Sequence, residues 1–369
     1  MSRVVVVGFM ATTVAAILLV VGWACSGADE SDGEPQQEAG PLAGNAQDSR
    51  LSEVRHWLYM IDVDLDQQAV DLIAASEHDL VVLDFIPSER GNAGYLMAEV
   101  VAQLQDAPNS KLVLTYINIG EAEDYRTYWQ DGWEAGDPGW ILGDDPDGWE
   151  GNFPVAFWNP EWREIWLAES GYIEAIVAAG FDGVYLDWVE AYSDELVLSK
   201  ASDAGLDARR EMVSWVTDLA DLARGLRPGF IVIAQNAAEL ADDDDYLRAI
   251  DAIAQEHVWF DGGVSNDPPG DCPLPATDDA VESDGYVQSL SDQCRRQHDE
   301  FPESTLHVSS EEYIAALTYA QQRGELIFTV DYALDPVNVA WTHETSRALG
   351  FVSFVGSRAL DVYVEPLPY

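Results

Sequence analysis

Short apolar segments of this chain end in acidic side chains. One segment, 183 to 186, leads directly to Asp187, and Glu190 follows three residues later. Another, 251 to 254, leads to Glu256. An ionised carboxylate beside an apolar core costs several kcal/mol unless it is paired or used in chemistry. We therefore expect these acids to belong to a functional site.

Other polar residues occupy the same kind of position after further apolar segments. These residues are Asp62, Asp84, Tyr116, Asn118, Glu121, Gln235, Asn236, Asp331, Tyr332 and Arg358. Any one of them could be structural, as a helix cap or as a partner for loop backbone. The complete set favours a functional site. Two carboxyl groups can cleave a glycosidic bond, because one protonates the leaving oxygen while the other attacks or stabilises the anomeric carbon.

Tryptophans are concentrated in one part of the chain, where seven of the thirteen lie between residues 129 and 166. Trp162 and Trp166 are four residues apart on an expected helix, which predicts core positions. Trp133, Trp140 and Trp149 instead lie among Gly, Asp and Pro residues. Their flat apolar faces could stack on sugar rings or fill the interior of a long loop. The sequence leaves these two interpretations open.

The elements that must position these residues alternate along the chain. Eight apolar segments of about five residues, without polar alternation, are typical of parallel strands buried on both faces. They are 57–61, 80–83, 112–117, 183–186, 230–234, 251–254, 326–330 and 351–355. Amphipathic segments between them predict helices at 66–76, 161–179, 207–224, 310–323 and 338–349. This pattern predicts a single α/β domain over residues 51–369, a (β/α)8 TIM barrel.

Local signals agree with these elements. Ser309 and Glu312 fit a helix capping box, and glycines stand at expected helix C-termini at 180, 324 and 350. A doubly wound sheet is the alternative fold. No Gly-rich phosphate loop follows the first strand, and the acidic turn 62–66 would repel a pyrophosphate. The sequence therefore excludes nucleotide binding, and we expect no cofactor.

The chain is strongly acidic, with 67 Asp and Glu residues against 18 Lys and Arg residues and a formal net charge of −49. Nucleic acid would be repelled. One interpretation is a salt-loving or otherwise acid-rich host, in which surface charge keeps proteins soluble. The other is a surface that attracts a cationic polymer. Because the acids are spread over the whole chain, the first interpretation is favoured.

The N-terminus has the features of an export signal. Arg3 precedes an apolar stretch from Val4 to Ala24, and Cys25 follows in a context that resembles a bacterial lipobox. We expect residues 1–25 to be a signal peptide with lipidation at Cys25, or else an uncleaved membrane anchor. Residues 26–50 have the composition of a flexible acidic linker. The expected location is extracellular, at the cell surface and membrane-anchored.

The remaining cysteines, Cys272 and Cys294, lie in one long insertion at about 257–308 and are predicted to form a disulfide. A metal site is not expected, because the six histidines show no ligand spacing with cysteines or carboxylates. The nucleophile elbow of serine hydrolases, Gly-x-Ser-x-Gly, is also missing from the sequence.

Several segments together resemble glycoside hydrolase family 114, and more closely its branch of extracellular glycosidases. They are 115–129 (TYINIGEAEDYRTYW), 155–162 (VAFWNPEW), 180–187 (GFDGVYLD), 234–236 (AQN) and 329–332 (TVDY). The similarity covers about 55 to 365, with the motifs in the same order as in the family. Trp158, in the second segment, joins the substrate-binding candidates.

The resemblance implies a TIM barrel and, for the characterised branch, endo-hydrolysis of α-1,4-linked galactosamine polymers. It implies that Asp187 and Glu256 are the catalytic acids. Glu190 stands where the family motif has a second Asp, which leaves its role open. The expected partner is therefore a polysaccharide or oligosaccharide, possibly a cationic amino-sugar polymer, bound by a monomer.

The residues around the two acids suggest their roles. Apolar neighbours of Glu256 predict that it stays protonated and acts as general acid and base. Asp187 would then be the nucleophile or charge stabiliser, kept ionised by donors such as Tyr116 or Asn236, although the roles could be exchanged. One alternative is a non-catalytic carbohydrate-binding lipoprotein on the same barrel. Another is a surface scaffold that binds no sugar.

Overall fold

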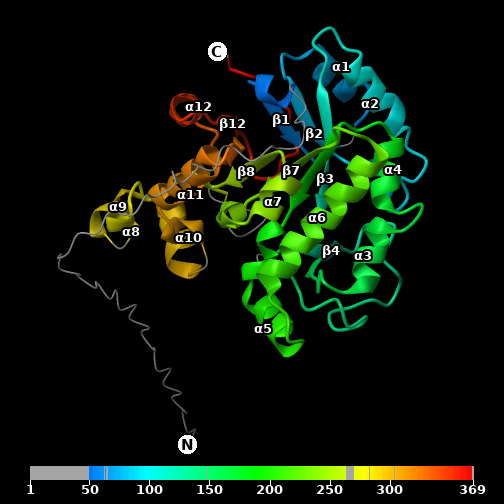
Figure 1. Ribbon diagram of the computed structural model, residues 1–369. Helices are drawn as coiled ribbons and strands as arrows, with labels where there is room; N and C mark the ends of the chain where they lie inside the picture. Colours follow the sequence, from blue (N-terminus) through cyan, green and yellow to red (C-terminus); the bar gives the residue numbers. More distant parts are fainter. Residues whose placement is uncertain are drawn as a thin grey trace, which may run out of the picture. The chain divides into compact units, whose positions relative to one another are not determined.

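The computed structural model describes residues 50–61, 63, 65–146, 148–262, 270–281, 283–302 and 304–367. Eight short strands in this part of the chain form one parallel sheet that curls into a barrel (Figure 1). The strands are β1 (Trp57–Met60), β2 (Leu80–Asp84), β3 (Leu112–Asn118), β6 (Gly183–Asp187), β7 (Ile231–Gln235), β8 (Ala252–Glu256), β11 (Leu326–Asp331) and β12 (Val352–Val355). Neighbours in the sheet follow chain order, and every pair is parallel.

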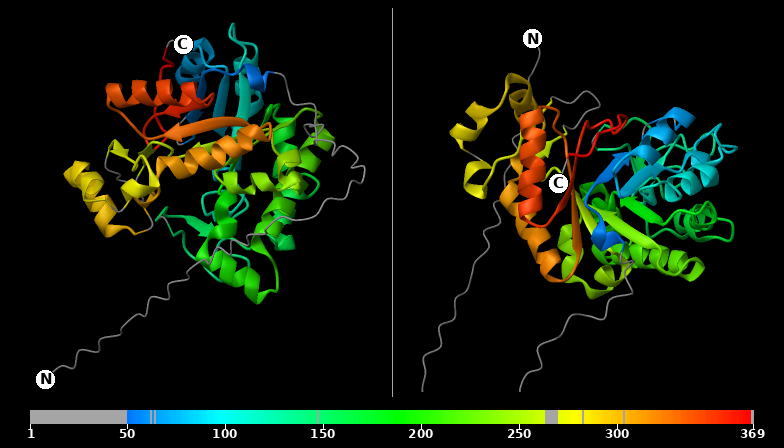
Figure 2. Two further views of the ribbon diagram at one scale, coloured as in Figure 1. Left: turned by 60° about the vertical axis from the view of Figure 1, so that its left-hand side comes forward. Right: turned by 90° about the horizontal axis from the view of Figure 1, so that it is seen from above.

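The barrel is nearly closed. Trp57 Nε1 on β1 donates to Val352 O on β12 at 3.2 Å, and Ile61 N donates to Leu360 O at 3.0 Å. Within the described residues, no backbone ladder joins these two strands. Helices surround the strands, as Figure 2 shows in two further views. The predicted barrel is therefore confirmed at the level of strands and surrounding helices, and the doubly wound sheet is wrong.

Helices follow most of the strands on the outside of the barrel. They are α1 (Gln67–Ala75), α2 (Met97–Gln105), α3 (Pro160–Leu167), α4 (Tyr172–Ala178), α5 (Glu195–Asp203), α6 (Ala208–Leu226), α7 (Asp244–Ala249), α11 (Ser310–Gln322) and α12 (Pro336–Ala348). Short 3-10 turns are η1 (Leu51–Glu53), η2 (Ile86–Ser88), η3 (Val189–Ser193), η4 (Ala238–Asp242) and η5 (Thr305–His307). In the described part of the chain, no helix has both the length and the apolar composition needed to span a bilayer.

Helix ends follow the local sequence signals. Ser309 Oγ accepts from Glu312 N at 3.0 Å at the start of α11, as the capping box predicts. The glycines at 180, 324 and 350 have φ of +92°, +106° and +79°, which the missing side chain makes accessible. The single helix predicted at 161–179 is wrong. The chain breaks it into α3 and α4 because Ser170 is left-handed, at φ +66°, and Gly171 packs against the carbonyl oxygens that end α3.

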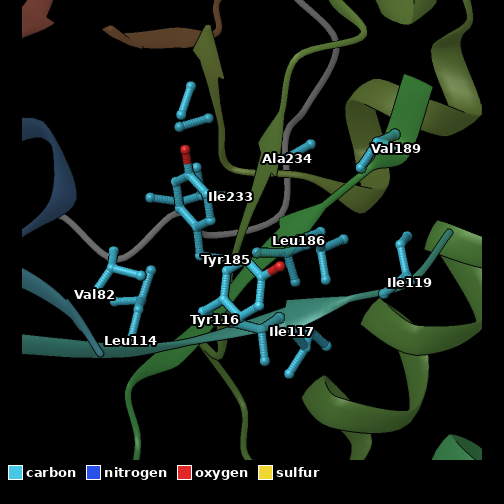
Figure 3. Packing of buried hydrophobic residues seen from close by; sticks show 14 of the residues in the cluster. Val82, Leu114, Tyr116, Ile117, Ile119, Tyr185, Leu186, Val189, Ile233 and Ala234 are labelled. Carbon is cyan, nitrogen blue, oxygen red and sulfur yellow. The ribbon is translucent and has the colours of Figure 1, made fainter. Parts of the chain in front are cut away.

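The strands are buried on both faces, so the barrel interior is a packed core. Aromatic rings from several strands fill it: Trp57 lies 5.5 Å from Phe328 and 5.8 Å from Phe354, and Tyr59 lies 4.8 Å from Tyr185, between ring centroids. Figure 3 shows part of this core, with labelled side chains that include Tyr185 and Leu186 of β6, Val82 of β2, Leu114 of β3 and Ile233 of β7. This core forms the floor of the cavity described below.

Two excursions from the barrel bear on the site. After β3 the chain forms the pair β4 (Glu121–Glu123) and β5 (Asn152–Pro154). After β8 comes the predicted insertion, with β9 (Phe260–Asp261), β10 (Cys272–Pro273), α8 (Asp278–Val281), α9 (Asp284–Ser289) and α10 (Asp292–Glu300). Cys272 and Cys294 form a disulfide there, with Cα atoms 5.4 Å apart. It lies in a small apolar cluster with Leu274, Leu290 and Leu306.

Candidate active site

A cavity of about 1750 Å³ lies at the C-terminal ends of the barrel strands. Each of the eight strands contributes to its lining, with its last residues or with the loop that follows. In strand order these residues are Tyr59, Asp84, Tyr116, Asp187, Gln235, Glu256, Tyr332 and Arg358. The predicted site residues Glu121, Glu190 and Asn236 line it too. TIM-barrel enzymes carry their active sites at this end, which makes the cavity the candidate site.

Asp187, the last residue of β6, accepts hydrogen bonds on both carboxylate oxygens. Tyr116 Oη donates to Oδ2 at 2.5 Å, and Trp188 N donates to Oδ1 at 2.8 Å. Burial, and then the negative charge of Glu256, nevertheless raises the pKa of Asp187 to about 7. Asp187 therefore binds a proton at a pH just below neutrality. Tyr116 donates to Asp187 as expected from the sequence, while burial and Glu256 oppose the expectation that Asp187 stays ionised.

Glu256, the last residue of β8, is surrounded by hydrogen-bond donors. Tyr332 Oη donates to Oε1, and Gln235 Nε2 donates to Oε2 at 2.5 Å. Asn236 Nδ2 lies farther from Oε2, at 3.4 Å. Tyr59 Oη donates to Gln235 Oε1 at 3.1 Å, which turns the amide N–H groups toward Glu256. The Glu256 carboxyl group is thus held in a fixed orientation by three side chains from β7 and β11 or the turns that follow them.

Glu190 is a third carboxyl group in the cavity, and Asn236 links it to Glu256. Asn236 Nδ2 donates to Glu190 Oε1 at 2.5 Å, while Asn236 Oδ1 accepts from Glu256 N at 2.9 Å. The second oxygen of Glu190 has no hydrogen-bond partner among the described residues. Burial, and then the charge of Asp187, raises the pKa of Glu190 well above its usual range. Asn236 thus forms hydrogen bonds with Glu190 and Glu256. The sequence had suggested it as a donor to Asp187.

The backbone turns in the same unusual way after three adjacent strands. Trp188 after β6, Asn236 and Ala237 after β7, and His257 after β8 all have φ between 54° and 57°. A residue other than glycine in this left-handed region costs about 1–3 kcal/mol, and such residues cluster at functional sites. Here the turn stops each strand at the residue whose side chain enters the cavity.

Arg126 forms part of the cavity wall, and the sequence did not single it out. Its guanidinium donates to Asp84 Oδ1 and to Glu123 Oε2, each at 2.7 Å, and all three side chains are buried. Burial raises the pKa of Asp84 to about 6 although Arg126 opposes the shift. Asp84 is therefore held in a buried ion pair at the cavity wall. The only sequence signal is the spacing of Glu123 and Arg126, three residues apart after a strand.

Glu121, on β4, is also buried at the wall. It accepts from Asn118 Nδ2 at 3.0 Å and from Asn152 Nδ2 at 3.3 Å. Burial, and then the neighbouring Asp145, raises the pKa of Glu121 well above its usual range. Asn118 also closes the turn before β4, because its Oδ1 accepts from Glu121 N at 2.8 Å.

Three predicted substrate-binding residues are not found in the cavity lining of the described chain: Asn118, Trp158 and Asp331. The Asn118 side chain forms its hydrogen bonds within the turn before β4. Trp158 packs edge-on against Phe157, with ring centroids 5.0 Å apart. Asp331 is fully buried and accepts from the backbone N–H groups of Trp259 and Phe260, at 2.6 and 3.0 Å, so it fixes the start of the insertion. These contacts favour a structural role for Asn118 and Asp331, and substrate binding by the three residues stays a prediction.

The tryptophans between residues 129 and 166 have different environments. Trp162 and Trp166 are buried, as predicted. Trp140 is buried as well, and the partly buried Trp133 packs against it with centroids 5.0 Å apart, outside the cavity lining. Trp149 lines the cavity, and the Arg358 guanidinium lies 4.4 Å from its ring centroid. Of the three loop tryptophans considered, only Trp149 reaches the site.

The insertion supplies one side of the cavity. His257 and Asp261 both line it, and the backbone N–H of Gly262 donates to His257 Nδ1 at 3.1 Å. Ser304 Oγ, from the far end of the insertion, donates to Asp261 Oδ2 at 2.9 Å. Neither His257 nor Asp261 was predicted from the sequence to line the site.

The described residues contain no group of His, Cys, Asp and Glu arranged to hold a metal ion. Two predicted residues, Asp62 and Cys25, lie outside the described part of the chain, together with the expected signal segment and linker.

Comparison with known proteins decides the family. The model of glycoside-hydrolase family GH114 matches residues 40–366. The chain belongs to glycoside-hydrolase family GH114. This GH114 protein is accordingly a glycosidase, and the resemblance noted in its sequence is confirmed.

Relatives of the GH114 protein include uncharacterized proteins from three organisms. One from Deinococcus radiodurans is 32% identical over 89% of this chain and 88% of its own length. One from Methanocaldococcus jannaschii is 34% identical over 56% of this chain and 57% of its own length. One from Thermotoga maritima is 32% identical over 56% of this chain and 60% of its own length.

Two solved structures share the fold of the GH114 protein. Ega3 from Aspergillus fumigatus, solved in complex with galactosamine, has a TM-score of 0.56 at 15% identity and covers 88% of this chain and 99% of its own. The glycoside hydrolase domain of PelA from Pseudomonas aeruginosa has a TM-score of 0.52 at 17% identity and covers 84% of this chain and 97% of its own.

Proposed function

We propose that this GH114 protein hydrolyses O-glycosidic bonds in an amino-sugar polysaccharide, with Asp187 and Glu256 as its two catalytic carboxyl groups. One observation carries the proposal. Both acids end separate barrel strands and line one cavity, and each is held by its own set of donors. Two carboxyl groups on either side of a sugar-sized space are what glycosidic cleavage requires.

The proposed roles follow from the difference between the two environments. The raised pKa of Asp187, about 7, suits a general acid that gives its proton to the leaving oxygen. Glu256, which Tyr332, Gln235 and Asn236 hold in place, is then the second carboxyl group, which attacks the anomeric carbon or activates a water molecule. This exchanges the roles that the sequence first suggested.

Tyr116 stabilises Asp187 during this proton transfer. When Asp187 loses its proton, the Tyr116 hydroxyl donates to the carboxylate and stabilises the charge. Burial raises the pKa of Glu190 well above its usual range, and when protonated Glu190 can donate from the oxygen without a partner among the described residues to an acceptor of the bound sugar.

The size and charge of the cavity support a polymeric amino sugar. A volume of about 1750 Å³ exceeds the ~300–1,000 Å³ that is usual for small-molecule pockets, so several sugar rings fit. Acids outnumber bases in the lining. They are Asp84, Glu89, Glu121, Asp124, Asp145, Glu150, Asp187, Glu190, Glu239, Glu256, Asp261 and Asp271, against Arg90, Arg126 and Arg358. Ammonium groups would be attracted, and the galactosamine bound by Ega3 is such a sugar.

We also propose that the enzyme works outside the cell, attached to the membrane through Cys25 or an uncleaved anchor. The export-type N-terminus supports this, and so does the disulfide between Cys272 and Cys294, since such bonds persist in oxidising compartments. Labelling of cells with radioactive palmitate would test it, because Cys25→Ala must abolish any label.

Product analysis tests the proposed reaction. The wild-type enzyme is expected to release reducing ends from α-1,4-linked polygalactosamine, as read by product mass. Asp187→Asn and Glu256→Gln should each lower kcat about 10²–10⁴-fold, the usual contribution of a positioned acid or base. Glu239→Gln, another acid of the lining, serves as the matched control and should keep most of the activity. Wild-type rates in both catalytic variants would refute the assignment.

A further inference from the structure

Three large apolar side chains are exposed together near the start of α12. Leu334, Val337 and Trp341 are 65%, 75% and 47% exposed, although they lie within eight residues of one another. Val337 and Trp341 are four residues apart on the helix, so their side chains are neighbours on one face. Leu334 also lines the cavity. An apolar strip therefore begins at the cavity edge and continues onto α12.

The strip is held in a fixed position. Trp341 packs nearly perpendicular to Trp259 and Phe260, at interplanar angles of 83° and 86° and centroid distances of 5.6 and 6.2 Å. These contacts fix its ring while almost half of the side chain stays exposed. Figure 2 shows α12 (orange-red) on the same side of the barrel as the insertion (yellow).

The insertion also holds the loop that carries Leu334. Asp271 accepts from Leu334 N at 2.6 Å, from Asp335 N at 2.8 Å and from Asn338 Nδ2 at 2.9 Å. Its neighbour in sequence, Cys272, is bonded to Cys294. The loop is thus tied to a disulfide-bonded segment, and a ligand on the strip would meet a surface that needs little ordering.

We propose that Leu334, Val337 and Trp341 form a platform that binds a cationic amino-sugar polymer where it leaves the catalytic cavity. The inference rests on the proposed function, because it assumes that the cavity takes a polymer longer than it can enclose. The platform would bind sugar rings by apolar contact and would act on long substrates only. Its chemistry is that of an aromatic residue against the C–H face of a sugar.

The charge of the protein and the contact between the platform and the cavity favour an amino-sugar polymer as the ligand of the platform. The net charge of −49 would repel an anionic lipid surface and also a second copy of the same chain. A chain of amino sugars carries ammonium groups, and Asp335, whose Oδ1 accepts from Val337 N at the start of α12, adds negative charge between Leu334 and Val337. Since Leu334 belongs to both surfaces, a polymer that leaves the cavity on this side reaches the platform without a gap.

Kinetics on substrates of two lengths test the platform. With α-1,4-linked polygalactosamine, Trp341→Ala should raise KM about three- to tenfold, the loss expected for one aromatic contact. With a galactosamine tetramer, its KM and kcat should stay at wild-type values. Val337→Ser should give a smaller change of the same kind, and it keeps the test valid if Trp341→Ala proves unstable, because Val337 is too exposed to support the fold.

Tyr319→Ala is the matched control, since Tyr319 is an aromatic residue of α11 with 45% exposure. It should leave both substrates unaffected. An unchanged polymer KM in both Trp341→Ala and Val337→Ser would overturn the platform. A second result would also overturn it: the wild type binds vesicles, Trp341→Ala abolishes this binding, and the polymer KM stays constant. The strip would then be a membrane contact.

Binding without turnover separates this inference from the proposed function. Polymer affinity can be measured by gel retardation in the Glu256→Gln background, with and without Trp341→Ala. If the wild type cleaves neither substrate, the proposed function fails, yet a loss of retardation on removing Trp341 still supports the platform. Equal retardation of the two proteins counts against it.

Discussion

At the scale of single residues, Asp187 and Glu256 differ because their neighbours differ. Both end a barrel strand, and both line the same cavity. Burial and the nearby charge of Glu256 both raise the pKa of Asp187 and so favour its protonated form. Glu256 accepts hydrogen bonds from the side-chain amides of Gln235 and Asn236. The same type of group therefore has different hydrogen-bond partners within one site.

The pH dependence of kcat/KM should report the proton on Asp187. A general acid must be protonated, so activity should be retained below pH 7 and fall as the pH rises through about 7. Tyr116→Phe removes a hydrogen bond that stabilises the ionised form of Asp187 and lowers its pKa. The fall in activity should then move to higher pH. A pH–rate profile from 5 to 9 for both proteins measures this.

Tyr125→Phe provides the control for Tyr116→Phe, because the Tyr125 hydroxyl donates to Glu123 and not to Asp187. Its high-pH fall should coincide with that of the wild type. If Tyr116→Phe shifts the fall to lower pH, Asp187 is not the acid.

At the scale of elements, the site depends on how tightly the turns after the strands pack. The turn between β3 and β4 passes so close to Trp188 that only glycine fits at position 120. A Cβ atom there would lie 2.5 Å from Trp188 O and 2.8 Å from Ala191 Cβ. Trp188 N in turn donates to Asp187. One turn thus fixes the backbone that carries the acid on the neighbouring strand.

Gly120→Ala should therefore damage catalysis through position. A shift of about 1 Å in a reacting group can cost ~10²-fold in rate, and we expect a loss of kcat/KM of that order. Gly94→Ala is the matched control, since nothing lies within 4 Å of a Cβ atom at that position. Thermal melts of both variants should accompany the kinetics. Full activity in Gly120→Ala would show that the turn has room to relax.

At the scale of the whole molecule, acidic groups have two separate uses. Most of the 67 acids contribute to a large negative charge. Others are buried, and some of these hold the barrel together: Asp182 accepts from Arg227 and Val113, and Asp251 from Arg224 and Val232, before β6 and β8 respectively. Glu325 is buried before β11, where burial and then Asp251 raise its pKa to about 8.

Stability should consequently fall as the pH rises from 5 to about 8.5. In that window the folded protein keeps protons on Glu325, Asp187 and Asp331, whose pKa values are raised to about 8, 7 and 7, while the unfolded chain has lost them. Glu325→Gln removes one of these groups. Its Tm should exceed that of the wild type by a few degrees at pH 8.5 and match it at pH 4.

Asp221→Asn is the control for Glu325→Gln, because Asp221 is exposed on α6. This change removes the negative charge of an exposed carboxyl group and leaves the buried carboxyl groups in place. The slope of Tm against pH should therefore stay nearly unchanged. A wild-type Tm that increases from pH 5 to 8.5 would contradict the prediction.

Much of the fold could be predicted because it depends on local patterns. All eight strands appear where the apolar segments predict them, as do α1, α6, α11 and α12. The helices α2, α5 and α7 were missed, although each lies between predicted strands. The strand-end rule placed Asp187, Glu190, Gln235, Asn236 and Glu256 around one cavity. It could not separate them from Asn118 and Asp331, whose side chains turn to nearby backbone N–H groups.

The sequence by itself determined the barrel, the end of the barrel that carries the site, and the acids that face it, because hydrophobic period and residue type act over a few residues. Only the tertiary structure decided that the pKa of Asp187 is raised to about 7, that Arg126 binds Asp84, and that Trp149 lines the cavity while Trp140 is buried. Protonation and burial depend on groups brought together from distant segments. A neighbour 69 residues away in the chain, Glu256, helps to set the charge of Asp187, and no local pattern records that distance.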